Sequence, residues 1–254
     1  MTRRTIALAV LMLTLAAGCS GSDDTEVIGR DESTVSTEDK PKTASSSPEE
    51  ETSTTREEMD LTVESGFTSS VDQIGTRYTS AGALVTNPNE NQASYDVQIL
   101  FNLMGPDGSV LDSDSANVPY IPAGSTIATA PLQIGFDIAA DPAGLEVTAT
   151  GDFRDDDGWD GVEFLSGAGI DLVVTDGQVA PGNFGTSLNA QVMNPSEEIA
   201  EFATWSCVFK AGGAIIGGET SSIVDRIPPG ATVALNVPLS AEVSADEVIC
   251  NAYA

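Results

Sequence analysis

The stretch that decides the fold of this chain reads Tyr95-Asp96-Val97-Gln98-Ile99-Leu100-Phe101-Asn102-Leu103. Its apolar side chains occupy every second position, and the positions between them are mostly polar. Alternate side chains of a β-strand point to opposite faces, so this pattern predicts a strand with one buried face. The turn sequence Gly105-Pro106-Asp107-Gly108 follows, and Val110 begins the expected return strand of a hairpin.

The pattern around this strand occurs twice in the chain. Asn87-Pro88 recurs as Asn194-Pro195, 107 residues later, and Ile121-Pro122-Ala123-Gly124 returns as Ile227-Pro228-Pro229-Gly230. In the second copy the buried positions of the matching strand are expected to be Ala203, Trp205, Cys207 and Phe209. A repeat of this length indicates a duplicated domain, because each copy is large enough to bury a core of its own.

Short strands separated by Asn-Pro, Asp-Gly and Pro-x-Gly turns predict an all-β protein. We expect two tandem immunoglobulin-like β-sandwich domains, at residues 61–154 and 170–254, joined by an acidic linker at 155–169. Beyond the first 19 residues the sequence shows no helical periodicity with capping residues.

The first copy resembles the FxLYD-type domains of secreted prokaryotic proteins. The resemblance lies in the strand quoted above, in Thr86-Asn87-Pro88-Asn89-Glu90 before it and in Gly108-Ser109-Val110 after it, with Phe101 and Leu103 as the F-x-L. Met104 and Gly105 stand where that pattern has Tyr and Asp, and the second copy keeps only Phe209. The resemblance implies small extracellular sandwich domains with no shared known activity, so it transfers no catalytic residue.

Residues 1–19 have the pattern of a lipoprotein export signal. Arg3 and Arg4 precede the apolar run Ile6–Ala17, which is too short to span a bilayer, and Ala-Ala-Gly precedes Cys19. The segment resembles a bacterial or archaeal lipobox, which implies that Cys19 is lipidated and begins the mature chain. The protein is then attached to the lipid bilayer through Cys19, on the extracytoplasmic face of the cell membrane.

Two alternatives to this interpretation remain open. The segment is also compatible with an ordinary secretory signal or an uncleaved anchor that happens to carry a cysteine. The export route is open as well: Thr2-Arg3-Arg4-Thr5-Ile6 resembles a twin-arginine motif, but two arginines also occur in signals of the general route.

Residues 20–60 consist almost entirely of Ser, Thr, Asp, Glu, Lys and Pro. Such a segment has too little apolar surface to offset its conformational entropy, and we expect a disordered tether about 35 Å long on average. The whole chain has 39 acidic and 10 basic residues and a net charge of −29. This charge excludes nucleic acid as a partner and indicates either a saline habitat or a solvated surface that resists association.

The other two cysteines are expected to form a disulfide. Cys207 is on the predicted buried face of its strand, and Cys250 is in the last strand. The matching positions of the first copy are Ile99 and Ala149, an apolar pair suited to a core. The alternatives are two free buried cysteines or a metal pair, and the latter lacks the histidines that would complete a site.

Catalytic and cofactor motifs are missing from the sequence. The chain has no histidine, which excludes Ser-His-Asp and Cys-His catalysis and the usual zinc sites, and we expect no cofactor. The acidic segment around Trp159 contains weak calcium candidates, namely Asp155, Asp157, Asp160 and Glu163. A solvated acidic linker explains the same residues, and we favour that interpretation.

The function expected from these features is a non-catalytic, membrane-anchored binding or scaffold module at the cell surface. Its partner is an unknown envelope protein or extracellular ligand. The alternative is an accessory subunit of a transporter or envelope enzyme that binds a solute or a protein. A hydrolase based on a pair of carboxylates is a remote third hypothesis.

Overall fold

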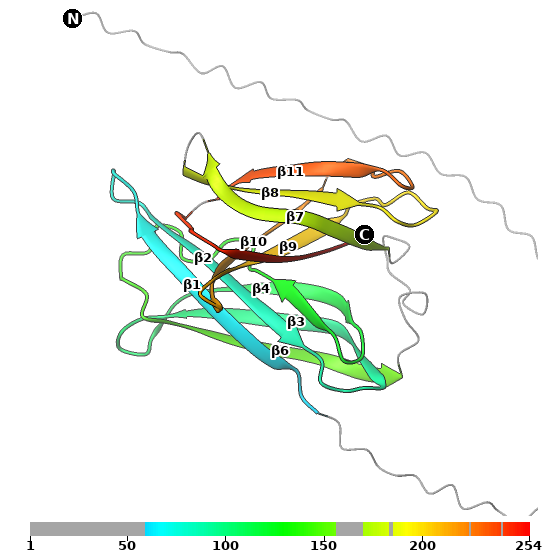
Figure 1. Cartoon of the computed structure of the whole chain (residues 1–254). Coiled ribbons are helices and arrows are strands. Elements are labelled where there is room, and N and C mark those ends of the chain that lie inside the picture. Colours follow the sequence, from blue (N-terminus) through cyan, green and yellow to red (C-terminus); the bar gives the residue numbers. More distant parts are fainter. Residues whose placement is uncertain (1–58, 156–169, 183–184, 224, 240) are drawn as a thin grey trace, which may run out of the picture. The chain divides into compact units, whose positions relative to one another are not determined.

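The computed structural model describes residues 59–155, 170–182, 185–223, 225–239 and 241–254. These residues form an all-β structure of strands joined by turns and loops (Figure 1). The strands of the first copy are β1 (Thr62–Val71), β2 (Arg77–Thr86), β3 (Gln92–Met104), β4 (Val110–Ile121), β5 (Thr126–Thr129) and β6 (Gly144–Asp155). Those of the second copy are β7 (Asp171–Gly182), β8 (Gly185–Met193), β9 (Thr204–Ala211), β10 (Ala214–Ser222), β11 (Thr232–Pro238) and β12 (Glu247–Tyr253).

The first copy consists of two antiparallel sheets that pack face to face. One sheet has the order β1-β2-β5 and the other the order β4-β3-β6. Alternate residues of β2, such as Ala83 and Val85, pack against Val97, Ile99 and Phe101 of β3, and all five are fully buried. The alternation predicted for the strand from Tyr95 to Leu103 is therefore confirmed.

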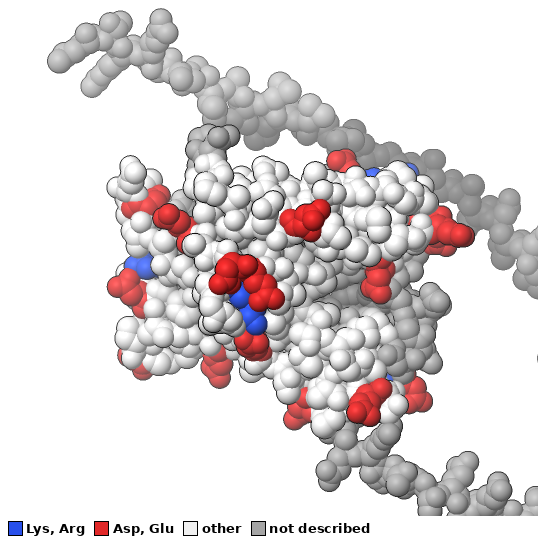
Figure 2. Space-filling model, in the orientation of Figure 1, with Lys and Arg blue, Asp and Glu red and all other residues white. Residues whose placement is uncertain are grey.

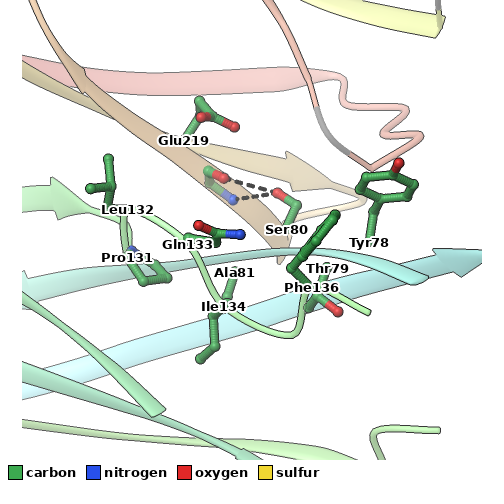
Figure 3. A pocket seen from close by; sticks show the side chains of 11 residues that line it. Tyr78, Thr79, Ser80, Ala81, Pro131, Leu132, Gln133, Ile134, Phe136 and Glu219 are labelled. Carbon is green, nitrogen blue, oxygen red and sulfur yellow. Dashed lines mark hydrogen bonds between the residues drawn. The ribbon is translucent and has the colours of Figure 1, made fainter. Parts of the chain in front are cut away.

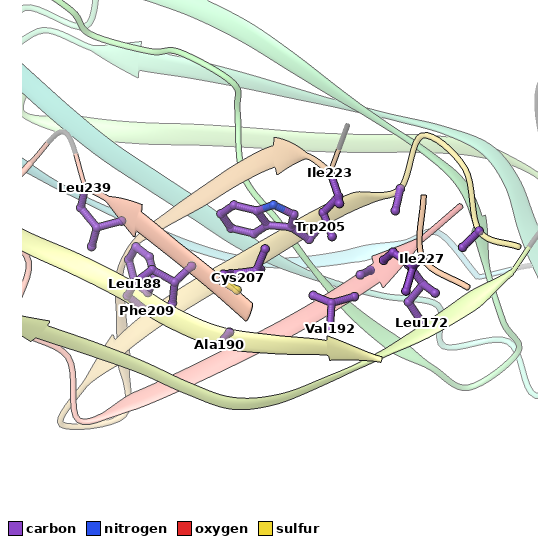
Figure 4. Packing of buried hydrophobic residues seen from close by; sticks show 14 of the residues in the cluster. Leu172, Leu188, Ala190, Val192, Trp205, Cys207, Phe209, Ile223, Ile227 and Leu239 are labelled. Carbon is purple, nitrogen blue, oxygen red and sulfur yellow. The ribbon is translucent and has the colours of Figure 1, made fainter. Parts of the chain in front are cut away.

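The second copy repeats this topology with one difference. Its strands form a continuous sheet of order β10-β9-β12-β7-β8-β11, because the start of β7 pairs with β12 and the rest of β7 pairs with β8. The sheet folds over at β7, so that β7-β8-β11 face β10-β9-β12 around a core containing Trp205, Cys207 and Phe209 (Figure 4). The all-β prediction is confirmed, and the immunoglobulin-like assignment stays a prediction.

The repeated Asn-Pro and Pro-x-Gly motifs contact each other in both copies. Asn87 is fully buried, and its Nδ2 donates to the carbonyl oxygens of Gln92, at 2.7 Å, and Ile121, at 3.3 Å. Asn194 is buried in the same way and donates to the carbonyl oxygens of Glu198, at 2.7 Å, and Ile227, at 2.8 Å. Each asparagine thus satisfies backbone groups that would otherwise be buried without a partner, which explains why the motif occurs twice.

The two copies lie against each other through the outer faces of two sheets. The strand β10 of the second copy contacts β1 and β2 of the first, and Figure 1 shows these strands close together. Leu84 and Ala128 of the first copy pack on Val208 and Ile215 of the second. The Ala128 N–H donates to Asn251 Oδ1 at 2.6 Å. Burial of these side chains between the copies joins the two sandwiches in one compact unit.

Glycine allows the two sheets to approach this closely. A Cβ atom built on Gly82 of β2 would lie 2.5 Å from the carbonyl oxygen of Gly217 on β10. A Cβ atom built on Gly218 would lie 2.9 Å from the carbonyl oxygen of Ala81. Because both contacts are to backbone atoms that cannot turn aside, only glycine fits at these positions.

The strand β9 differs from its prediction because of this contact. The expected buried positions Ala203, Trp205, Cys207 and Phe209 are indeed buried. Val208 and Ser206, on the opposite face of β9, are buried as well, since that face is covered by the first copy. The sequence predicted one buried face for each central strand, and β9 is covered on both.

The outer face of β7-β8-β11 in the second copy corresponds to the contacting face of the first copy, and it carries more polar residues. The pair Leu84 and Ala128 between the copies corresponds to Gln191 and Ala234 on the outer face of the second copy. The paired glycines Gly66 and Gly82 correspond to Gln178 and Asn189. The outer face of the second copy therefore lacks the leucine and the two glycines through which the first copy makes this contact.

Candidate functional site at the joint between the copies

A pocket of about 300 Å³ opens where the two copies meet. Three segments line it: the start of β2, which carries Tyr78 and Ser80, the loop after β5 with Gln133 and Phe136, and β10 with Glu219 (Figure 3). Residues of both copies therefore form the walls, and neither copy alone has this pocket.

The loop that forms one wall is held by hydrogen bonds to two strands, β4 and β2. The N–H groups of Gln133 and Gly135 donate to the carboxylates of Asp114, at 2.9 Å, and Asp112, at 2.7 Å, on β4. The Thr79 hydroxyl donates to the Gly135 carbonyl oxygen at 3.3 Å. Backbone positions fixed in this way keep the pocket open without a ligand, which lowers the entropic cost of binding.

Arg77 ties the far end of the same loop to β2. Its guanidinium forms an ion pair with Asp141 and donates to Ser69 Oγ at 3.1 Å. Its carbonyl oxygen accepts the Asp137 N–H at 3.0 Å. The Arg77 side chain is only 14% exposed, so solvent screens its charge less than it screens the charge of a fully exposed arginine.

The opposite wall is joined to the first copy by Ser80. Its hydroxyl donates to the Gly218 carbonyl oxygen at 2.9 Å and accepts the Gly218 N–H at 3.0 Å, as the dashed lines in Figure 3 show. Because the hydroxyl is engaged in both directions, it is not available as a nucleophile.

Among the described residues that line the pocket, Glu219 supplies the only carboxyl group. Burial raises the pKa of this carboxyl to about 7, because desolvation disfavours its charged form. Within the described part of the chain it has no hydrogen-bond or ion-pair partner. A carboxyl held in this state gains stability from any group that compensates its charge.

Two aromatic rings lie at the edge of the pocket. The rings of Tyr78 and Phe136 meet edge to face, with centroids 5.6 Å apart. Phe136 is 50% exposed and the neighbouring Leu132 is 73% exposed, so apolar surface faces the solvent beside the opening. Aromatic and apolar walls with a few polar groups are typical of small-ligand sites.

The charge of the surface is dominated by carboxylates. Figure 2 shows Asp and Glu side chains scattered over the visible face, with few Lys or Arg among them. The Lys210 side chain is only 14% exposed and forms an ion pair with Glu64 at 3.6 Å, between the copies.

The disulfide expected between Cys207 and Cys250 is present. The two residues lie directly opposite each other on β9 and β12. In the first copy Ile99 lies directly opposite Ala149 in the same way, on β3 and β6. The apolar pair and the disulfide therefore occupy equivalent places in the two cores.

The remaining predicted site residues lie mostly outside the described residues. Cys19 does, and so do the calcium candidates Asp157, Asp160 and Glu163. Asp155 is the last residue of β6 and lies opposite Gln92 of β3. In the ranges that the structure describes, no group of three or more Cys, Asp or Glu side chains is arranged to hold a metal ion.

The described ranges also contain no helix that is long and apolar enough to cross a membrane. Comparison of the chain with models of known protein families returned no match, and neither did comparison with curated proteins.

Sequence reasoning did not single out Glu219, Tyr78 or Phe136. These residues belong to different copies or to an irregular loop, and they come together only because the copies pack face to face. One signal was present in the sequence: Gly217-Gly218-Glu219 places a charged residue beside two small ones inside a strand, where close approach of another backbone is expected.

Proposed function

We propose that this protein is a lipid-anchored, extracytoplasmic, non-catalytic binding module whose binding site is the pocket at the joint between the copies. The observation that carries the proposal is the construction of that pocket. Its walls are fixed by hydrogen bonds that the carboxylates of Asp112 and Asp114 accept and by those of the Ser80 hydroxyl, and no described residue pairs with Glu219. A preformed site with one uncompensated polar group is suited to binding.

The same pocket argues against hydrolysis by paired carboxylates. That chemistry needs two carboxyl groups about 5–10 Å apart around the scissile bond. Among the described residues that line the pocket, Glu219 has no second carboxyl beside it. The engaged hydroxyl of Ser80 removes the nearest alternative nucleophile.

Anchoring is supported by the sequence alone, through Cys19 and the polar segment 20–60. The test is to express the full chain and a Cys19→Ala variant in a host that processes lipoproteins. We expect the unmodified chain to incorporate a radiolabelled fatty acid and to sediment with membranes, and the variant to lose both properties. A double variant, Cys207→Ala with Cys250→Ala, is the control and keeps the lipid label. Equal membrane association of the unmodified chain and Cys19→Ala would contradict the proposal.

A second candidate is an accessory subunit that docks on another envelope protein. The apolar side chains of Leu132 and Phe136, exposed beside the pocket, favour it. A photoreactive amino acid placed at Leu132 is expected to crosslink a defined envelope protein in intact cells, whereas the same group at Thr148, on the polar outer face of β6, is not. Identical crosslinks from both positions, or none from Leu132, would argue against docking.

A further inference from the structure

We propose that the pocket at the joint between the copies binds an organic cation, with Glu219 as the counter-ion of its ammonium group and Tyr78 and Phe136 against its apolar body. This inference rests on the proposed function, because it names the chemical class of ligand for the same pocket.

The first argument is the state of the Glu219 carboxyl. It lines the pocket and has no hydrogen-bond or ion-pair partner in the described chain, and burial raises its pKa to about 7. A partly buried carboxylate gains most from a positive charge brought within a few ångströms. An anionic ligand would be repelled by the Glu219 carboxylate, and an uncharged ligand would compensate its charge less than a cation does.

The second argument is that the basic side chains on neighbouring strands are already engaged. Arg77 of β2 is paired with Asp141, and Lys210 of β9 is paired with Glu64. Neither is paired with Glu219, so the described part of the chain does not supply the missing positive charge. The net charge of −29 raises the local concentration of cations around the molecule and favours their entry.

The third argument is the nature of the other walls. Tyr78 and Phe136 present ring surfaces at the opening, and rings attract ammonium groups within about 6 Å. Gln133 adds an amide whose oxygen is an acceptor for an ammonium N–H. The volume of about 300 Å³ accommodates one alkyl- or arylalkyl-ammonium group.

Such a group comes either from a free amine or from a lysine side chain on a partner protein. The probes are therefore benzylammonium, its uncharged analogue benzyl alcohol, and N-acetyl-lysine amide, which presents the ammonium group as a protein does. Binding of each probe to the full chain in detergent micelles is measured at pH 8 by ligand-observed NMR, with competition between probes. Glu219→Gln, Phe136→Leu and the exposed-site control Glu146→Gln are measured alongside.

We expect benzylammonium to bind with a Kd of about 1 mM and benzyl alcohol to bind at least tenfold more weakly. Glu219→Gln should weaken benzylammonium binding at least tenfold, Phe136→Leu should weaken it severalfold, and Glu146→Gln should leave it unchanged. Tighter binding of N-acetyl-lysine amide than of benzylammonium supports a lysine side chain as the source, and the reverse supports a free amine.

Equal binding of benzylammonium and benzyl alcohol to the unmodified chain would overturn the inference, and this comparison requires no variant. Unchanged binding by Glu219→Gln, with a circular dichroism spectrum like that of the unmodified chain, would overturn it too. So would the absence of saturable binding by both cationic probes. None of these results affects the fatty-acid labelling of Cys19, so failure of this inference is distinguishable from failure of the anchored-module proposal.

Discussion

Ser80 of the first copy and Gly218 of the second exchange two hydrogen bonds across the joint between the copies. The serine hydroxyl takes the place of a neighbouring strand for the backbone of Gly218, at the outer edge of β10. The contact exists only because Gly217 and Gly218 leave room for the β2 backbone. It links the stacking of the copies to the pocket, since both residues also line that pocket.

Replacement of Gly82 by alanine tests whether the close approach of the sheets holds the copies together. The new Cβ would meet the backbone of Gly217 at 2.5 Å, and the sheets would have to separate. We expect a loss of about 3 kcal/mol in the free energy of unfolding, measured by urea denaturation.

The matched control is Gly144→Ala on β6, where a Cβ would lie 3.8 Å from the Met104 Cβ, an ordinary contact. We expect the control to change stability by less than about 1 kcal/mol. Equal effects of the two substitutions would show that the joint tolerates a larger separation than the structure indicates.

The contribution of the disulfide to stability is tested by replacing its two cysteines with the residues at the equivalent positions of the first copy. A double variant, Cys207→Ile with Cys250→Ala, reproduces the pair Ile99 and Ala149 in the second core. Loss of the cross-link over a separation of 43 residues removes about 4 kcal/mol on the loop-entropy estimate.

The Ile/Ala variant should unfold at higher urea than a variant with alanine at both positions, because isoleucine fills the space that the smaller side chain leaves empty. Reduction of the unmodified protein with dithiothreitol should lower its melting temperature. No effect of the reductant on melting, with labelling confirming two free thiols, would contradict a stabilising disulfide.

Asn87 and Asn194 are expected to contribute equally to stability, since each satisfies backbone carbonyl groups in a buried turn. Substitution of either by alanine leaves those carbonyls without a partner and should cost about 2–3 kcal/mol.

Asn236→Ala is the control for the asparagine substitutions, because its side chain also makes a hydrogen bond, to Asn189, but at an exposed site. Water replaces that bond, so the cost should stay below about 1 kcal/mol in the same urea titrations. If Asn236→Ala lowered the free energy of unfolding as much as Asn87→Ala, burial of the asparagine would not explain the loss.

Glu219 is expected to make the protein less stable as the pH rises. Its pKa is about 7 in the folded chain and near 4.5 when unfolded. Below pH 4.5 the carboxyl is neutral in both states and has no effect. As the pH rises from 4.5 to 7 the unfolded chain loses the proton first, so the free energy of unfolding falls, and above pH 7 the loss is complete.

Glu219→Gln should abolish this fall. We expect the variant to be more stable than the unmodified chain by about 2 kcal/mol at pH 8, after allowance for the partial exposure of the side chain, and equally stable at pH 4. Melting curves of both proteins across this range, with Glu146→Gln as the exposed control, provide the measurement. A constant difference between Glu219→Gln and the unmodified chain at every pH would assign the effect to packing.

Much of each copy was predictable because its determinants are local. The alternation from Tyr95 to Leu103, the turn at Gly105–Gly108 and the Asn-Pro motifs describe contacts close along the chain or within one copy. The pairing of Cys207 with Cys250 was predictable because the duplication supplied a second observation of the same position, the apolar pair Ile99 and Ala149. Comparison of the two copies thus indicated which residues lie opposite each other on neighbouring strands.

The joint was not predictable from these patterns. Burial of Val208 and the exposure of Leu100, at the equivalent place in β3, depend on which sheet the other copy covers. The hydrophobic pattern of a strand predicted the face that packs against the other sheet of the same copy. It did not predict the face that the other copy covers. The two faces of β9 are buried by different parts of the chain, so its pattern did not reveal both.

The sequence by itself thus determined that the chain is all-β, that it is duplicated and that two cysteines pair, because each of these follows from side-chain periodicity or from residues at matched positions. The tertiary structure alone decided that the copies pack through glycine-lined sheets, that Lys210 pairs with Glu64, and that Glu219 lies in a pocket where no described residue pairs with it. These features depend on the packing of surfaces far apart in the chain, and no local pattern specifies which surfaces meet.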